Sequence, residues 1–505
     1  MIFIKSLFLF LMSSVALANF YISPYLQRMT TNSVYVQWES SSKKTQRIYF
    51  GETKDRLTRR ASVKKIKTRI KWRKPNIYLF QTKLTKLKPN TKYYYQVRNA
   101  HGQSKVYEFT TNSPSSNKNF TFLVLSDAQS GYYNTRNVTR YGLMKHTFNE
   151  GRRLPSFSLF SGDLVQRGIL HFQWKKHFFD PLKPLLARVP IIPVYGNHEY
   201  QTKKFKQYFR PPLNSKRKEN HNYSTFDYQS VRFVNLNSSA GSRTKRQLKF
   251  LRNVLARTEK DRKIKFVIAQ FHHPHLSEIW PDGEKKYSRK MVDIFKSFSR
   301  RSKKQTVIFT GHAHSYAKGY DHDSRLTFIT VGPVGGFLDR WDSESRDYLT
   351  IHKTISHHGW VRVDVDGDQM KISRLGSLPR DRNTGKVRVV DQTILNLKQY
   401  EVEAPEVYSA KIKGSKLYFK ASPLKAIGGK VDHLSSQIRL IYSNGKKIAH
   451  INKENIYGGY KKVIDTLSQS SLSLRSYGKN VKAIQLRYRS SNLDWGPWSK
   501  SVKVE

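Results

Sequence analysis

The 505-residue sequence predicts an α/β domain flanked by an N-terminal and a C-terminal β-sandwich domain. Three observations support this prediction. In the middle of the chain, apolar runs that read as buried strands alternate with stretches of helical periodicity, which is typical of α/β domains. On either side, short alternating segments are separated by turn residues, as in β-sandwiches. Hydrophobic residues make up 38% of the chain, enough for packed cores, and the length suits about three domains.

The N-terminus, residues 1–18, is predicted to be a signal peptide. Lys5 supplies a positive charge, residues 7–15 are largely apolar, and Ala16-Leu17-Ala18 matches the small-residue cleavage pattern. The apolar run is short for a membrane span, so cleavage is favoured over an uncleaved anchor. We therefore expect a secreted or periplasmic protein with no transmembrane segment after signal cleavage.

Residues 19–112 are predicted to form the N-terminal sandwich. Val34, Val36 and Trp38 alternate onto one face of a strand. Residues 87–91 form a turn that leads into a second alternating strand, residues 93–97, and this pattern resembles the late strands of fibronectin type III domains. A polar linker, residues 112–117, follows and marks the boundary.

The C-terminal part, residues 403–505, again reads as short strands. Ile484, Leu486 and Tyr488 alternate, and Asn444-Gly445 is a candidate hairpin turn. This pattern predicts a second β-sandwich.

The middle segment, residues 119–397, contains five strand-like runs that each lead to a polar residue able to bind metal. In α/β folds, ligands gather just beyond the carboxyl ends of the strands, so these residues are expected to lie together. A lone histidine near an apolar strand is usually structural, but five ordered blocks are not explained in that way. The residues are Asp127, Asp163, Asn197 with His198, His272, and His312 with His314.

Carboxylate and amide oxygens mixed with imidazole nitrogens suit Fe, Mn or Zn. A carboxylate such as Asp163 can bridge two ions. Two ions roughly 3.5 to 4 Å apart clamp the attacking and leaving oxygens of an in-line displacement. The sequence therefore predicts two divalent or mixed-valence metal ions as cofactors.

Four short blocks resemble the signature of calcineurin-like metallophosphoesterases, and the preceding sandwich resembles that of the purple acid phosphatase branch. The likeness covers roughly residues 20–370. It implies an αββα sandwich, with two stacked mixed sheets flanked by helices. The blocks are Gly162-Asp163, Gly196-Asn197-His198-Glu199, His272-His273-Pro274 and Gly311-His312-Ala313-His314.

The resemblance also implies roles for individual residues and a reaction. Phosphate monoesters would be hydrolysed through attack by a metal-bound hydroxide, and His198 would contact the phosphate and protonate the leaving oxygen. His273 either faces the substrate, together with Asn197 and His198, or only flanks a ligand. The implied metal ligands are Asp127 and His314 for one ion, Asn197, His272 and His312 for the other, and Asp163 as the bridge.

Two positions depart from the family pattern. Gln129 stands where many relatives have the histidine of a D-x-H block, and Gln166 stands where the purple branch has a tyrosine. A ferric-tyrosinate centre is therefore not expected. Gln129 is a candidate oxygen ligand of the ion assigned to Asp127 and His314. Without its oxygen, that first metal site has fewer protein ligands.

Composition restricts the partners and leaves two rival functions open. The chain has no cysteine, which excludes disulfides and thiolate metal sites. A formal charge of +56 favours small phosphorylated substrates and non-specific association with polyanions, such as nucleic acid or an anionic envelope, although a generally basic proteome explains it equally. The first rival is a phosphodiesterase, nuclease or nucleotidase. The second is a catalytically decayed envelope binding protein.

Overall fold

The computed structural model describes residues 20–505 except 67–75, 150, 213–220, 240–243, 303, 322–323, 325, 347, 349, 377–386, 398–400, 429–430, 432, 452–453, 457–470 and 491–494. The predicted signal peptide lies outside the described residues. The chain forms two compact units. The first comprises Met1–Ser113 with Leu186–Pro190, and the second comprises Pro114–Leu185 with Ile191–Glu505.

The first unit contains a sandwich of two antiparallel sheets. Its core is aromatic: the rings of Trp38 and Phe80 stack at 6.0 Å, and those of Tyr93 and Phe109 at 5.8 Å. The Tyr93 hydroxyl accepts a hydrogen bond from the Lys88 backbone N–H at 3.0 Å, which fixes the turn before its strand. One sheet orders β1 (Phe20–Gln27), β2 (Val34–Ser40), β6 (Tyr78–Leu84) and β5 (Val63–Ile66); the other contains β4 (Arg59–Ala61), β3 (Arg47–Gly51), β7 (Lys92–Asn99), β8 (Gly102–Gln103) and β9 (Tyr107–Thr110).

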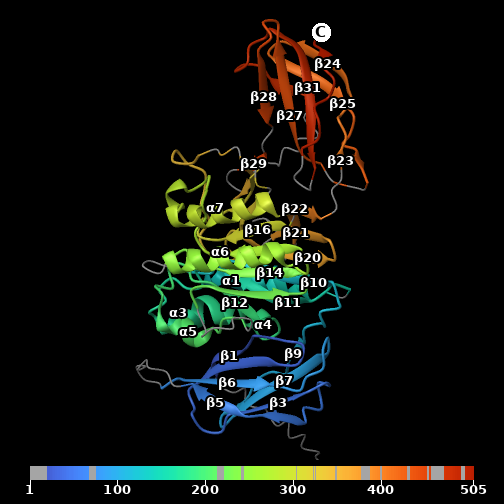
Figure 1. Cartoon of the computed structure of the whole chain (residues 1–505). Helices are drawn as coiled ribbons and strands as arrows, with labels where there is room; N and C mark the ends of the chain where they lie inside the picture. Colours follow the sequence, from blue (N-terminus) through green and yellow to red (C-terminus); the bar gives the residue numbers. More distant parts are fainter. Residues whose placement is uncertain are drawn as a thin grey trace, which may run out of the picture. The chain divides into compact units, whose positions relative to one another are not determined.

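The second unit begins with two mixed sheets (Figure 1). In the sheet of six described strands, β10, β11 and β12 are parallel, and the other three strands join antiparallel. Its order is β12 (Ile191–Pro193), β11 (Pro155–Phe160), β10 (Asn119–Leu125), β20 (Gly359–Asp366), β21 (Gln369–Gly376) and β22 (Arg388–Asn396).

The sheet of eight described strands is parallel at its centre, where β14, β15, β16 and β18 lie side by side. Its order is β13 (Ser224–Tyr228), β14 (Val231–Asn235), β15 (Phe266–Gln270), β16 (Gln305–Thr310), β18 (Leu326–Thr330), β17 (Tyr316–Asp321), β19 (Ile351–Ile355) and β29 (Glu454–Ile456).

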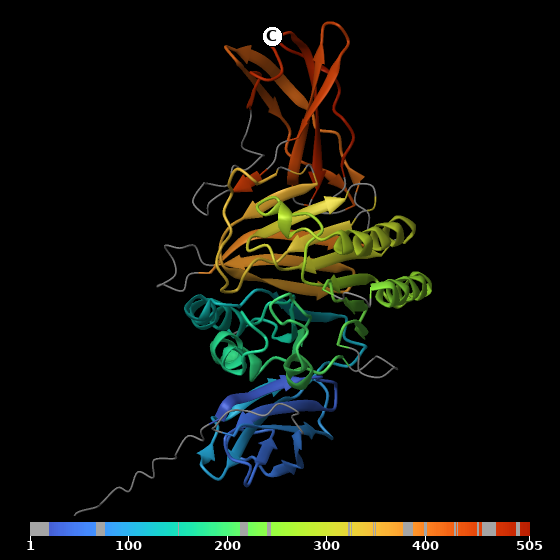
Figure 2. The ribbon, with the colours of Figure 1, turned by 90° about the vertical axis from the view of Figure 1, so that its left-hand side faces the viewer.

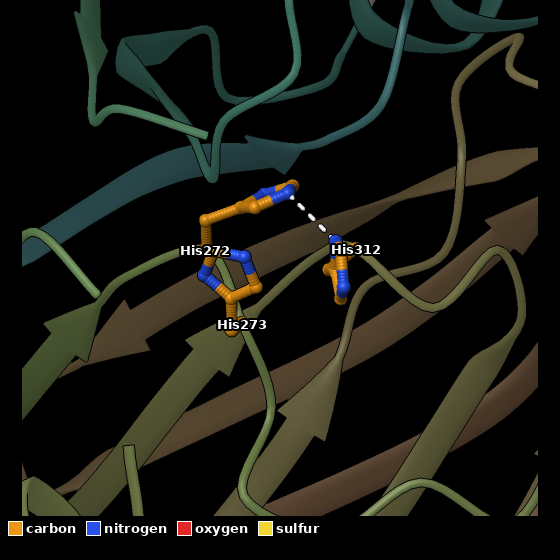
Figure 3. A group of neighbouring side chains, drawn as sticks. All are labelled: His272, His273 and His312. Atoms are coloured by element: carbon orange, nitrogen blue, oxygen red, sulfur yellow. Dashed lines mark hydrogen bonds between the residues drawn. The ribbon is translucent and has the colours of Figure 1, made fainter. Parts of the chain in front are cut away.

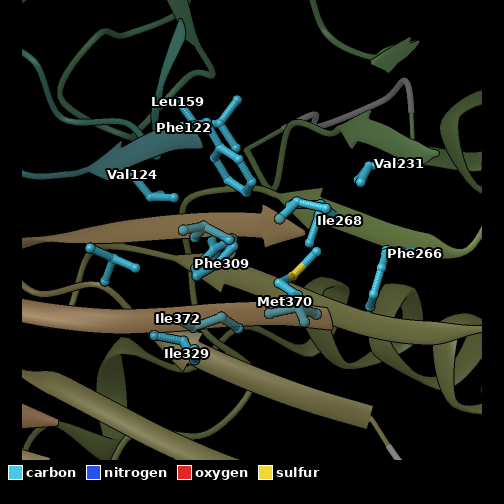
Figure 4. Close-up of a cluster of buried hydrophobic side chains, with 14 of the residues drawn as sticks. Phe122, Val124, Leu159, Val231, Phe266, Ile268, Phe309, Ile329, Met370 and Ile372 are labelled. Carbon is cyan, nitrogen blue, oxygen red and sulfur yellow. The ribbon is translucent and has the colours of Figure 1, made fainter. Parts of the chain in front are cut away.

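The two sheets pack face to face. Phe122 and Leu159 from one sheet and Ile268 and Phe309 from the other belong to a single buried apolar cluster (Figure 4). Alternate residues of each strand point into this layer because side chains in a strand alternate between the two faces.

Helices cover the outer faces. α6 (Thr244–Lys260) and α7 (Lys286–Arg301) lie over the eight-stranded sheet and bury Leu251, Leu255 and Phe295 against it (Figures 1 and 2). This burial follows the helical spacing that the sequence predicts. The six-stranded sheet is covered by α1 (Tyr132–Asn137), η1 (Val138–Leu143), α2 (Met144–Thr147), α3 (His171–Gln173), η2 (Trp174–Phe179) and α4 (Asp180–Leu186), and α5 (Lys203–Tyr208) follows β12. The predicted αββα fold class is confirmed.

The C-terminal segment of the second unit is β-rich. Ile484, Leu486 and Tyr488 are buried, and Gly445 takes a positive φ of 81° in the turn between β27 and β28. Three sheets order as β24 (Val407–Lys413), β25 (Lys416–Ala421) and β30 (Ser471–Ser473); β28 (Lys447–Ile451), β27 (His433–Tyr442), β31 (Val481–Ser490) and β32 (Val502–Lys503); and β23 (Glu401–Val402) with β26 (Ala426–Ile427). Among the described residues, no helix has the length and apolar character needed to cross a membrane.

Candidate metal centre

Predicted site residues lie at the carboxyl ends of strands from both sheets. Asp127, Asp163 and Asn197 follow β10, β11 and β12. His272 and His312 follow β15 and β16 of the other sheet. Because the two sheets face each other, these strand ends meet in one place.

The side chains converge in two overlapping groups. Ligand atoms of Asp127, Asp163 and His272 all lie within 4.8 Å of one another, as do those of His272, His273 and His312. Figure 3 shows the second group, with His272 directed towards His312. His272 belongs to both groups and therefore lies at the centre of the site.

Lone pairs converge on the His272 ring. Its Nδ1 lies 2.8 Å from the Ser161 carbonyl oxygen, which can only accept, so Nδ1 carries a proton. Its Nε2 then faces Asn197 Oδ1 at 3.0 Å, Asp163 Oδ2 at 3.1 Å and His312 Nδ1 at 3.2 Å. One nitrogen with at most one proton cannot satisfy three hydrogen-bond acceptors. These four atoms are therefore suited to binding a cation together.

The electrostatics also favour positive charge here. Burial alone would lower the pKa of His272, but the Asp163 and Asp127 carboxylates outweigh it and raise that pKa to about 9. Burial opposes ionisation of Asp163 as well, yet His272 lowers its pKa. Burial and the neighbouring His272 lower the pKa of His312 far below its usual range, which keeps its imidazole neutral and able to bind a metal.

Gln129 lies among the predicted ligands at the other end of the site. Its Nε2 is 2.8 Å from His314 Nε2 and 3.2 Å from Asp163 Oδ2, and His314 Nε2 is 3.8 Å from Asp127 Oδ1. The Gln129 side chain is buried, and its Oε1 has no hydrogen-bond partner. A buried carbonyl oxygen without a donor is costly, and a nearby cation would satisfy it.

Gln166 lies beside the site and contacts other residues. Its Oε1 accepts a hydrogen bond from the Ser130 hydroxyl at 2.6 Å, and its backbone oxygen lies 2.8 Å from His198 Nδ1.

His198 differs from the candidate ligands. Its backbone N–H donates to Asp163 Oδ1 at 3.0 Å, whereas its Nε2 is 3.8 Å from Asp163 Oδ2. It belongs to neither group of converging ligand atoms in the described part of the chain. Its side chain is 24% exposed, while that of His272 is fully buried. His198 is therefore accessible to a substrate.

His273 is buried behind His312. Its Nδ1 lies 2.7 Å from the Ser238 hydroxyl, and its ring centre is 4.3 Å from that of His312. Only 3% of the residue is exposed. These surroundings favour the flanking alternative over direct substrate contact, and a substrate role for His273 stays a prediction.

Three of the candidate ligands have a strained backbone. Asp127, Asp163 and His312 have positive φ angles of 53°, 55° and 72°. Such conformations cost about 1–3 kcal/mol each in non-glycine residues, and they cluster at functional sites. Gly162 also has a positive φ, and a Cβ there would lie 2.6 Å from His272 Nδ1. The close approach of the His272 ring explains why the Gly162-Asp163 block begins with glycine.

Sequence reasoning assigned no role to Glu199 or to Trp280. The buried Glu199 carboxylate accepts hydrogen bonds from the backbone N–H groups of Gly196 at 2.7 Å, Leu164 at 2.7 Å and Asp163 at 3.0 Å. Burial, and then the Asp163 charge, raise the pKa of Glu199 to about 8. In the sequence, the only indication of a role for Glu199 was its position in the G-N-H-E block. No sequence signal pointed to Trp280, whose ring centre lies 4.7 Å from that of His312 through the packing of its loop.

A centre of carboxylates, an amide and imidazoles at the carboxyl edge of an αββα sandwich defines the class of metal-dependent phosphoesterases. Residues 120–327 match the family model of the calcineurin-like phosphoesterases, and residues 21–111 match that of the purple acid phosphatase N-terminal domain. The chain thus carries a calcineurin-like phosphoesterase domain behind a purple acid phosphatase N-terminal domain, and it is a phosphoester-hydrolysing enzyme. The predicted family is confirmed.

Solved structures share this fold. The purple acid phosphatase PPD1 from yellow lupin (Lupinus luteus) seeds matches with a TM-score of 0.58 at 17% identity, covering 74% of each chain. PhoD matches with a TM-score of 0.57 at 12% identity, covering 82% of this chain and 93% of PhoD. A search of curated proteins finds no match.

Proposed function

We propose that the chain is an exported enzyme that hydrolyses phosphate monoesters with two bound metal ions. The observation that carries this proposal is the convergence of possible ligand atoms from five strand ends around the buried Asp163 and His272. Export is supported by the predicted signal peptide alone.

The residues present divide naturally between two ions. Asp163 Oδ2 lies 3.1 Å from His272 Nε2 and 3.2 Å from Gln129 Nε2, so this carboxylate contacts residues assigned to both ions and would bridge them. When bound, the ions supply Lewis-acid charge to the phosphate oxygens and lower the pKa of water. Fe, Mn and Zn suit the donors, and Gln166 in place of tyrosine argues against a ferric-tyrosinate centre. The assigned ligands are Asp127, His314 and the Gln129 oxygen for one ion, and Asn197, His272 and His312 for the other.

His198 is assigned to the leaving group. The contact between its Nδ1 and the Gln166 carbonyl oxygen fixes the orientation of the ring. When the ring is doubly protonated, its Nε2, on the Asp163 side, can donate a proton to the leaving oxygen, and the neutral ring that remains keeps its proton on Nδ1. Asn197 and His198 would contact the phosphate together, because they are adjacent in the loop after β12.

The test is a substrate panel with protein loaded with a single defined metal. The proposal predicts faster hydrolysis of an aryl phosphate monoester than of the matching diester or of DNA. Preference for the diester or DNA would instead support the phosphodiesterase rival. Protein that binds no metal and cleaves none of the substrates would support the decayed binding protein.

A further inference from the structure

Trp280 is an exposed aromatic residue beside the candidate metal centre. Its ring centre lies 4.7 Å from that of His312, with an angle of 32° between the planes. The residue is nevertheless 40% exposed, although a large apolar side chain stabilises a fold when it is buried. Single exposed aromatic residues are common on proteins, so the feature that marks Trp280 is its contact with the candidate metal ligand His312.

The local backbone is shaped around the indole. The Trp280 backbone N–H donates to the Ser277 hydroxyl at 3.2 Å, and its carbonyl oxygen accepts from the Gly283 N–H at 3.0 Å. A Cβ on Gly283 would lie 2.8 Å from the indole and 3.3 Å from the His312 ring. Only glycine leaves room for the indole next to His312.

Buried carboxylates anchor this loop. Glu278 is 1% exposed and accepts hydrogen bonds from the Thr354 hydroxyl at 2.7 Å and the Tyr348 N–H at 3.0 Å. Glu284 accepts from the Ser277 N–H at 3.0 Å and the Tyr348 hydroxyl at 2.7 Å. The loop that carries the indole is thus held in place before any ligand binds, which limits the entropy lost on binding.

The loop beside His314 presents a second exposed aromatic. Phe337 is 71% exposed, and its carbonyl oxygen accepts a hydrogen bond from His314 Nδ1. Each histidine of the G-H-x-H block therefore has an exposed aromatic residue from a neighbouring loop close to it.

We infer that Trp280 is a specificity-determining residue whose indole stacks against a flat leaving group of the phosphate ester. The inference rests on the proposed function, because it concerns the same centre. The shared chemistry is a planar π system attached through oxygen to phosphorus or carried close to it, as in an aryl phosphate or a nucleoside monophosphate. Stacking suits both because each offers a flat face.

The experiment compares the wild type with W280A and W280F on three monoesters: 4-nitrophenyl phosphate, a nucleoside 5′-monophosphate and glycerol phosphate. W280A should lower kcat/KM on the order of tenfold or more for a flat leaving group, mainly through KM, because one stacking contact is lost. Glycerol phosphate should change by less than about twofold, and W280F should keep most of the preference. The aromatic substrate with the larger loss identifies the leaving group.

The matched control is Phe172→Ala, since Phe172 is similarly exposed on α3. Metal content should equal that of the wild type in all variants. An equal loss on all three esters would assign Trp280 to supporting His312 and overturn the inference, as would no loss at all. A wild type that hydrolyses no monoester would contradict the proposed function itself and the inference with it.

Discussion

His198 and His272 are both held next to Asp163, but their surroundings give them different tasks. His272 is buried, and its Nε2 faces the side-chain oxygens of Asn197 and Asp163, which can bind the same cation. His272 therefore suits metal binding. His198 is partly exposed and its Nδ1 contacts a carbonyl oxygen, so it suits contact with substrate.

We predict that His198→Ala lowers turnover but leaves metal content near that of the wild type. The loss should be on the order of 10²–10⁴-fold, as for a positioned acid or base. His272→Ala is the paired control and should lose metal, because it removes the nitrogen on which the other donors converge. Elemental analysis beside steady-state kinetics measures both. Loss of a metal equivalent in His198→Ala would reassign His198 as a ligand.

Gln129 should set the affinity of the first metal site. Gln129→Ala removes the candidate oxygen ligand and should weaken binding of one metal equivalent on the order of tenfold or more. Gln129→His restores the D-x-H block and should tighten it. Metal titration of chelator-stripped protein measures the affinity without any substrate. Two equivalents bound by Gln129→Ala as tightly as by the wild type would exclude Gln129 from the ligand set.

At the scale of residues, the sequence was informative because each candidate ligand lies in the loop that follows a strand. Asp163 and His272 could be expected to meet as soon as an α/β fold was predicted. Trp280 and Glu199 could not be assigned in the same way. The position of Trp280 depends on a loop anchored through Glu278 to Thr354, far along the chain.

At the scale of elements, Glu199 joins the loops that follow β11 and β12. Its carboxylate accepts N–H groups from Asp163 and Leu164 on one loop and from Gly196 on the other. Two strand ends that carry candidate ligands are therefore fixed to each other by one buried side chain.

Glu199→Gln should destabilise the metal-free protein by about 1–3 kcal/mol, because an amide group would face backbone N–H donors. Metal binding should weaken as well, since Asp163 and Asn197 lie on the two loops that Glu199 joins. Denaturant unfolding and metal titration measure the two effects. Glu344→Gln, at an exposed position, is the control. Unchanged stability and affinity would show that the loops hold their positions without this carboxylate.

Strand existence was predictable from apolar runs, whereas strand order was not. β20 pairs antiparallel with β10 across more than 200 residues, and local periodicity carries no information about that pairing. β17 and β19 likewise extend the eight-stranded sheet through tertiary packing.

At the scale of the whole molecule, the charge of +56 is the dominant property. Exposed charges act through solvent and are screened beyond roughly 8 Å at physiological salt. We predict that binding to DNA or anionic vesicles weakens steeply as salt rises, with little sequence preference. Hydrolysis of a small aryl phosphate should change much less over the same titration. If the protein binds neither DNA nor anionic vesicles at low salt, the charge reflects amino-acid composition alone and does not create a binding surface for polyanions.

Metal dependence tests the central claim most directly. Hydrolysis of an aryl phosphate monoester is measured before chelation, after chelation and after addition of Mn, Zn or Fe. The account predicts that chelation abolishes hydrolysis and that one of these metals restores it. Asp163→Asn should be the most damaging single change, because a neutral amide bridges two cations poorly. Full activity in metal-stripped protein would contradict the account.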